Sequence, residues 1–266
     1  MIDNATSVEI YENEKFSDKL LRTAIDVAEN LIKCGGTVHN AEDTVERICK
    51  AHGAIHVEVF SITSVIIASV RMKDGEYAMQ TRRIYGFNNN FTKLDKLNSI
   101  SRDLCDKKIT LDEAQAKIRE AKAENTYPPM IKVLVSMIIS GSFALFFGGT
   151  LLDAAASAVL GAFITVLSSF VPKTLNKLAT NLLLSTITGF MAIFCSKLGF
   201  GDNYDKIIIG TIMLVIPGLS FGTSIRDLLG GDTLSGMLQL IQSILLAATI
   251  AFGYTIAIFF LGSWIV

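Results

Sequence analysis

The chain has 266 residues and a formal net charge of −1, and half of its residues are hydrophobic. This near-neutral balance argues against a nucleic-acid-binding protein, because such a protein needs a basic surface to neutralise phosphates. The averages conceal two unlike halves: residues 1–129 carry most of the charge, whereas charged residues are sparse beyond Met130. The composition therefore predicts an α+β domain at 1–127 and a membrane domain at 128–266.

The first 14 residues contain four acidic residues and no basic one. They lack the basic and then apolar order of a signal peptide, so we expect the N-terminal half to stay in the cytoplasm. The four cysteines show no pairwise metal or redox spacing, and a disulfide framework is not expected.

Two helices are predicted first. From Phe16 to Lys33 the apolar residues follow helical spacing, and Gly35-Gly36 ends the pattern. A second helix is expected from Asn40 to Ala51, capped by Asn40 or Thr37.

Strands follow these helices. Residues 55–62, 64–72 and 77–84 are rich in β-branched and aromatic residues, which is typical of a short antiparallel sheet. Helices are expected again at 93–107 and 110–124, where Thr110 and Glu113 have the spacing of a capping box.

Candidate chemistry in this domain is limited to His39, Glu42 and Asp43 near the start of the second helix. Acidic residues in a first helical turn are favoured by the helix dipole, which is the simpler explanation of Glu42 and Asp43. Neither a metal site nor another cofactor is expected, and no nucleophile with a base and an orienting group can be assembled. We therefore expect no enzyme activity.

Five segments have the length and apolar character needed to cross a bilayer as helices. The fourth is marginal because it contains Pro217 and Gly218. The segments are about 131–148, 151–171, 179–198, 205–222 and 235–262. Lysines and arginines gather before the first segment and in the second and fourth connections, so the N-terminus should be cytoplasmic and the C-terminus outside, in the plasma (inner) membrane.

Small and hydroxyl residues recur in these segments, and they let membrane helices pack closely. We interpret them mainly as packing residues. Gln239, Gln242 and Ser243 share one helical face, and such a polar stripe should face protein or water.

The apolar sequence is interrupted twice within 16 residues, at Pro217-Gly218 and at the charged group Arg226, Asp227 and Asp232. Proline and glycine end or unwind a helix and free main-chain groups, which lipid tolerates only beside protein or water. The interruption fits a polar pathway through the membrane. It fits equally well an ordinary loop whose charges lie among the headgroups.

Two patches resemble the threonine/serine exporter (ThrE) family. The first is Gly35 to Thr44 together with Val57-Glu58-Val59-Phe60, although His39-Asn40 departs from the longer polar pair expected there. The second, more specific patch runs from Ile216-Pro217-Gly218 through Arg226-Asp227-Leu228 and Gly231-Asp232 to Ser235-Gly236. The resemblance covers roughly Leu20 to Gly253.

The resemblance implies the larger subunit of a split exporter that works with a small five-helix membrane partner, as a hetero- or homo-oligomer in the lipid bilayer. It implies export of small polar metabolites driven by an ion gradient, with threonine and serine or succinate-type dicarboxylates as substrates. Arg226 could then bind a substrate carboxylate, and Asp227 or Asp232 an amino group or a proton. The alternative is a membrane scaffold or sensor that does not transport and whose cytoplasmic domain binds a ligand.

Overall fold

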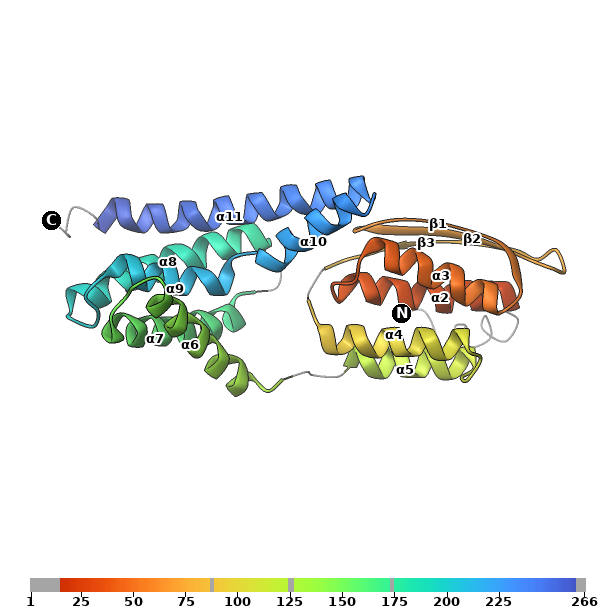
Figure 1. The fold of residues 1–266 in the computed structure, drawn as a ribbon, viewed down its shortest axis with the longest axis horizontal. Helices are drawn as coiled ribbons and strands as arrows, with labels where there is room; N and C mark the ends of the chain where they lie inside the picture. Colours follow the sequence, from red (N-terminus) through yellow and green to blue (C-terminus); the bar gives the residue numbers. More distant parts are fainter. Residues whose placement is uncertain (1–14, 87–88, 124–126, 173–174, 262–266) are drawn as a thin grey trace, which may run out of the picture. The chain divides into compact units, whose positions relative to one another are not determined.

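The computed structural model describes residues 15–86, 89–123, 127–172 and 175–261. These residues are mostly helical, with one three-stranded sheet (Figure 1). They divide into two compact units. The first contains the described residues before 127 together with Thr223–Leu238, and the second contains the rest.

The N-terminal part of the first unit has three layers (Figure 1). Helices α2 and α3 cover one face of the sheet, and α4 and α5 pack against the other side of α2. One hydrophobic core joins the three layers. The helices are α2 (Phe16–Lys33), α3 (Val38–Ala51), α4 (Phe91–Cys105) and α5 (Leu111–Ala123).

The ends of these helices follow from local chemistry. Helix α2 stops where predicted, because Gly35 adopts a φ of 98° and the amide of Gly36 returns to the carbonyl of Leu31. Helix α3 begins at Val38, two residues before the predicted start, with the hydroxyl of Thr37 accepting from the amide of Asn40 at 3.1 Å. The predicted capping box of α5 is confirmed, since Thr110 and Glu113 each accept a hydrogen bond from the other's amide.

The predicted antiparallel sheet is also confirmed, in the order β1-β2-β3. Its strands are Ala54–Ile62, Val65–Met72 and Tyr77–Arg83. Residues of β2 alternate, with Ile66, Ala68 and Val70 buried under α2 and α3. On the opposite face Phe60, Tyr77 and Met79 are more than half exposed, and no helix or strand among the described residues before 127 covers this face (Figure 1).

Among the described residues, four helices are long and apolar enough to cross a membrane. They are α6 (Pro129–Phe146), α7 (Leu151–Phe170), α8 (Lys177–Lys197) and α11 (Thr233–Leu261). Helices α9 (Tyr204–Val215) and α10 (Gly218–Leu229) make a fifth span if the bent pair is counted as one. The predicted segments match α6, α7, α8 and α11 to within two residues, except that position 262 lies outside the described residues.

Helices α6, α7 and α9 pack on small residues, as their sequence predicted. The hydroxyl of Ser140 donates to the carbonyl of Ser157 at 2.7 Å. A Cβ on Gly210 would lie 2.3 Å from the Ser157 hydroxyl and 2.5 Å from the Ser140 carbonyl, so only glycine allows this approach of the three helices.

Helix α11 packs on α8 and α9 through a stripe of buried residues at helical spacing: Ser243, Leu246, Ile250, Tyr254 and Ala257. A Cβ on Gly189 of α8 would lie 2.7 Å from that of Ala257. The Tyr254 hydroxyl shares a 3.2 Å hydrogen bond with Thr211 of α9. The opposite face of α11 remains apolar and exposed, as lipid or another chain requires.

Candidate functional site

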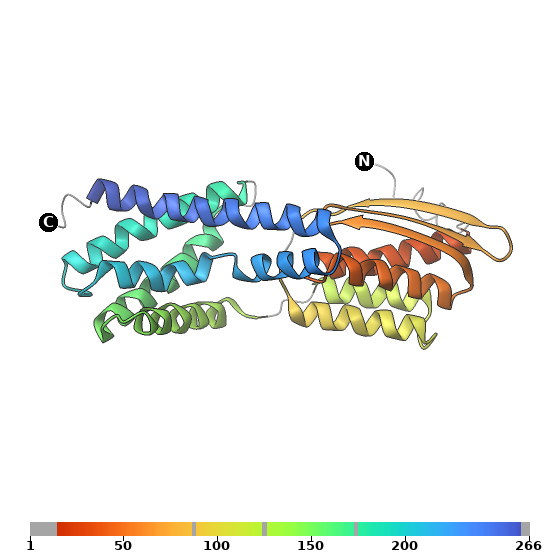
Figure 2. The ribbon, with the colours of Figure 1, turned by 45° about the horizontal axis from the view of Figure 1, so that its top comes forward.

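The helix break occurs where the sequence predicts it. Helix α9 ends at Val215 and α10 begins at Gly218, and Figure 2 shows the break between them. The bend between the two helices is 52°. Pro217 has no N–H to give the carbonyl of Met213, and the amide of Gly218 donates instead to Ile216 at 2.9 Å. The last turn of α9 therefore loses two helical hydrogen bonds.

The charged group lies elsewhere than expected. Arg226 and Asp227 were predicted in a connection after a fourth span ending near 222, and this prediction was wrong because α10 continues to Leu229. Both residues belong to its last turn. Hydropathy treats charged residues as loop, although arginine and leucine favour helices.

The turn between α10 and α11 is only three residues long and tightly built. The amides of Gly231 and Asp232 return to the carbonyls of Leu228 and Asp227, at 3.3 and 3.0 Å, and Gly231 has a φ of 96°. The two helices then cross at Gly236, where a Cβ would lie 2.7 Å from Cγ of Leu228 and 2.9 Å from the carbonyl oxygen of Ser224. Residues 224–236 form what we call the α10–α11 hairpin.

Asp227 is the unusual residue of this hairpin. Its side chain is 4% exposed, while that of the neighbouring Arg226 is 59% exposed. Oδ1 of Asp227 accepts no hydrogen bond from any described residue and lies 3.9 Å from Nε of Arg226. A buried carboxylate oxygen without a donor is costly, so it calls for a functional explanation.

The predicted pathway residues do not form a single cluster. Gly218 and Arg226 lie at opposite ends of α10, about 12 Å apart along the helix axis. On α11, Ser243 is buried and donates to the carbonyl of Gln239, whereas Gln242 is exposed. Within this polar stripe, Ser243 therefore faces the protein interior and Gln242 faces outward.

The candidates of the first unit have structural roles in their contacts. Oε1 of Glu42 accepts from the amide and the hydroxyl of Ser61, at 2.6 and 3.0 Å, and so ties α3 to the end of β1. Asp43 pairs with Arg47 at 3.1 Å on the surface, and His39 is exposed. Because α3 begins at Val38, neither acid lies in its first turn, and the helix-dipole explanation was wrong.

Asp153 is a residue that the sequence analysis did not single out. It is fully buried at the start of α7. One oxygen accepts from the amides of Asp202 and Asn203, at 2.7 and 2.9 Å, and the other from the amide of Thr150 and Nδ2 of Asn203, at 2.9 and 3.0 Å. Only the capping pattern of Thr150 and Asp153 was visible in the sequence, because Asp202 and Asn203 lie some 50 positions away.

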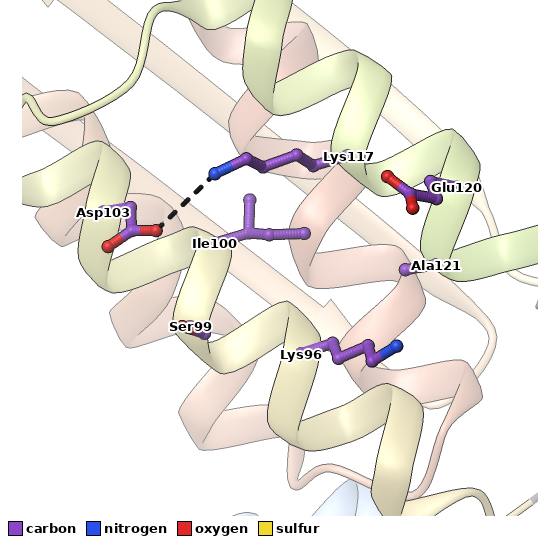
Figure 3. Close-up of a pocket in the computed structure, with 7 residues that line it drawn as sticks. All are labelled: Lys96, Ser99, Ile100, Asp103, Lys117, Glu120 and Ala121. Atoms are coloured by element: carbon purple, nitrogen blue, oxygen red, sulfur yellow. Dashed lines mark ion pairs between the residues drawn. The ribbon is translucent and has the colours of Figure 1, made fainter.

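A surface pocket of about 250 Å³ between α4 and α5 was also not predicted (Figure 3). Lys117 reaches toward Asp103 across it at 3.9 Å, and Lys96 and Glu120 lie at its other end. Ile100 and Ala121 are buried and form its floor. Charges of both signs line the pocket, but they are already paired or exposed to solvent.

No group of three or more histidine, cysteine or acidic side chains in the described residues could hold a metal ion. Burial raises the pKa of Cys49, in the core of the first unit, to about 12, so its thiol is unreactive at neutral pH.

Comparison with known proteins decides the family. The sequence profile of the threonine/serine exporters, ThrE, matches residues 22–261. The chain belongs to the ThrE family. No curated protein and no solved structure matches the chain.

Membership in ThrE confirms the resemblance found in the sequence and places the chain among multi-pass membrane transporters. Transport agrees with the expectation that the chain is not an enzyme. Both family-like patches coincide with packed turns. The first contains Glu42, which anchors Ser61, and the second contains the helix break and the α10–α11 hairpin.

Proposed function

We propose that the chain is a subunit of a secondary exporter of small polar metabolites, with threonine- and serine-type amino acids as the first candidates and succinate-type dicarboxylates as the second. The observation that carries the proposal is the broken pair α9–α10 leading into a charged hairpin, within a chain of the ThrE family. Broken helices at membrane depth are tolerated where they line a polar route.

The proposed topology counts α9 and α10 as one span, which gives five spans. The first unit's sheet and helices then form a cytoplasmic α+β domain and the C-terminus lies outside. The support is the distribution of lysine and arginine. Lys132 lies in the first turn of the first span, Lys177 opens the third, and Arg226 lies in the last turn of the fourth, so all three fall on the same side of the membrane. The α10–α11 hairpin then lies at the cytoplasmic side, where an exported substrate arrives.

In this proposal Arg226 receives the substrate carboxylate. Its guanidinium is mostly exposed, so it is available to a solute, and it offers a planar fork that matches a carboxylate. The N-terminus of α10, after Pro217, offers the positive end of the helix dipole as a second place for an anion. Gln239 and Gln242 extend the polar route along α11.

We also propose a companion, the small five-helix membrane subunit that the split family form implies. The exposed apolar faces support it: in the most hydrophobic windows of α6 and α11 only 22% and 28% of residues are buried. Lipid covers part of this surface, and a second chain would complete the route that a bent helix pair begins.

Efflux of radiolabelled serine, threonine and succinate from loaded cells tests the proposal. Cells that express the chain with its companion should release one of these substrates faster than cells without the chain. Arg226→Ala should abolish the difference, while Arg119→Ala, which removes an exposed arginine of α5, should preserve it.

Unchanged efflux with Arg226→Ala, at equal amounts of inserted protein, would remove Arg226 from the route. No efflux of any of the three substrates by the unaltered chain would favour the scaffold or sensor instead. The α4–α5 pocket would then be the first place to look for a ligand.

A further inference from the structure

We infer that Asp227 binds the small monovalent cation, a proton or Na⁺, whose gradient drives transport. The inference rests on the proposed export function and adds the ion site to it. It starts from Oδ1 of Asp227, which is buried and accepts no hydrogen bond from any residue in the described part of the chain.

A buried carboxylate needs compensation for the water it has lost. Arg226 does not provide it, because its Nε is 3.9 Å away, beyond hydrogen-bond distance, and its side chain is turned mostly to solvent. Asp232, in the turn, has the wrong charge. The first turn of α11, which packs on this part of α10, contributes only uncharged residues, including the buried Ser235.

The space at the hairpin limits what the compensating partner is. At Gly236 the two helices are so close that a single added carbon would overlap Leu228 and the Ser224 carbonyl. Where the helices cross, this spacing leaves no room for an amino acid, which would bring its α-carbon and side chain together with its ammonium group. A proton on Oδ1, or a dehydrated Na⁺ held by the carboxylate and neighbouring oxygens, is small enough.

Asp153 shows what a structural carboxylate looks like in this chain. It is equally buried, but four N–H groups donate to its two oxygens. Asp153 therefore remains buried as an anion without any ion from solution. Oδ1 of Asp227 has no such donor among the described residues, although serine hydroxyls and backbone groups are plentiful in the hairpin.

This difference gives a mechanism for coupling. With the cation bound, Asp227 is neutral and the hairpin closes as the structure shows it. When the cation leaves, the bare carboxylate favours a hairpin that opens to water. The binding step is a simple association, in which a proton adds to Oδ1 to give the carboxylic acid, or Na⁺ coordinates the carboxylate. The cation therefore shifts the balance between two arrangements of α10 and α11.

Inverted membrane vesicles containing the chain and its companion test the inference. In one arm the vesicle interior is more acidic than the medium and Na⁺ is absent. In the other arm the Na⁺ concentration is higher inside the vesicles and the pH is equal on both sides. We expect one arm to drive substrate accumulation, and Asp227→Asn to reduce it about tenfold or more. The same variant should keep exchange of labelled for unlabelled substrate, which needs no gradient.

Asp205→Asn, at an exposed ion pair with Lys206, is the control and should leave accumulation and exchange unchanged. Accumulation that survives in Asp227→Asn would overturn the inference. So would loss of exchange together with accumulation, because Asp227 would then bind substrate or hold the fold. If the unaltered chain performs neither process, the export function itself fails, and the two results are thereby distinguished.

A second measurement does not depend on transport. The thermal stability of the purified chain with its companion is recorded against pH and against Na⁺ concentration. A stabilisation by one cation that disappears in Asp227→Asn supports the site, and a chain that responds to neither cation overturns it.

Discussion

Two buried aspartates, each near a helix end, have opposite surroundings. Asp153 lies where the α6–α7 and α8–α9 connections meet and accepts four hydrogen bonds. Asp227 lies at the end of α10 with one oxygen that receives none from the described residues. The carboxylate of Asp153 is thus held mainly by backbone N–H groups, whereas Oδ1 of Asp227 in the hairpin still needs a partner. Burial alone does not separate a structural carboxylate from a functional one, but the count of donors does.

The largest expected effect comes from exchanging each carboxylate for an amide. In Asp153→Asn one oxygen becomes an NH₂ group that faces two N–H donors, which should cost about 2–4 kcal/mol. In Asp227→Asn the replaced carboxyl group has an Oδ1 that loses no donor among the described residues, and the stability of this variant should equal or exceed that of the unaltered chain. Thermal unfolding of the purified variants measures both. Equal losses in the two variants would erase the distinction.

The next effect compares two glycines in the helices of these regions. Gly210→Ala would force a Cβ into the Ser157 hydroxyl and the Ser140 backbone, so we expect a loss of about 1–3 kcal/mol. At Gly222 of α10 a Cβ meets nothing within 4 Å, and alanine should be neutral or stabilise by up to about 1 kcal/mol. Thermal unfolding again provides the measurement. An unchanged stability of Gly210→Ala would show that α6, α7 and α9 can move apart at this contact at little cost.

The smallest effect is expected in the first unit, where Glu42 accepts two hydrogen bonds and the neighbouring Asp43 makes only an exposed ion pair. Glu42→Ala deprives the amide and hydroxyl of Ser61 of their acceptor and should cost about 1–2 kcal/mol, with faster hydrogen exchange at the Ser61 amide. Asp43→Ala breaks only an exposed pair with Arg47 and should change stability by about 0.5 kcal/mol or less. Similar exchange rates in both variants would contradict a structural role for Glu42.

Much of the fold could be predicted because its signals are local. The apolar periodicity of α2 and its Gly35-Gly36 stop specify that helix within a few residues, and Thr110 with Glu113 specifies the start of α5. The spans α6, α7, α8 and α11 follow from their apolar length alone. Each of these inferences needs only neighbours in the chain.

The site could be predicted only in part, because its decisive features depend on distant residues. Pro217 predicts a helix break from its own chemistry, because it lacks an N–H. The burial of Asp227 and the crossing of α10 and α11 at Gly236 are tertiary features that the local sequence does not show. Three of the four donors to Asp153 come from the connection before α9, and the α4–α5 pocket exists only where two helices pack. The end of α10 was also not predicted, because a hydropathy criterion assigns charged residues such as Arg226 and Asp227 to loops.

The missing N–H of Pro217 has a mechanical consequence. Pro217 gives no helical hydrogen bond to the carbonyl of Met213, and the amide of Gly218 donates to Ile216, so bending at the Ile216–Pro217 link costs fewer helical hydrogen bonds than bending elsewhere in α9 or α10. Helices α6, α7 and α9, in contrast, are held close together at Gly210. We therefore expect any change in the angle between α9 and α10 to occur at this link. Helix α9 lies on the tightly packed side of the link. Helix α10, on the other side, carries Arg226 and Asp227 in its last turn.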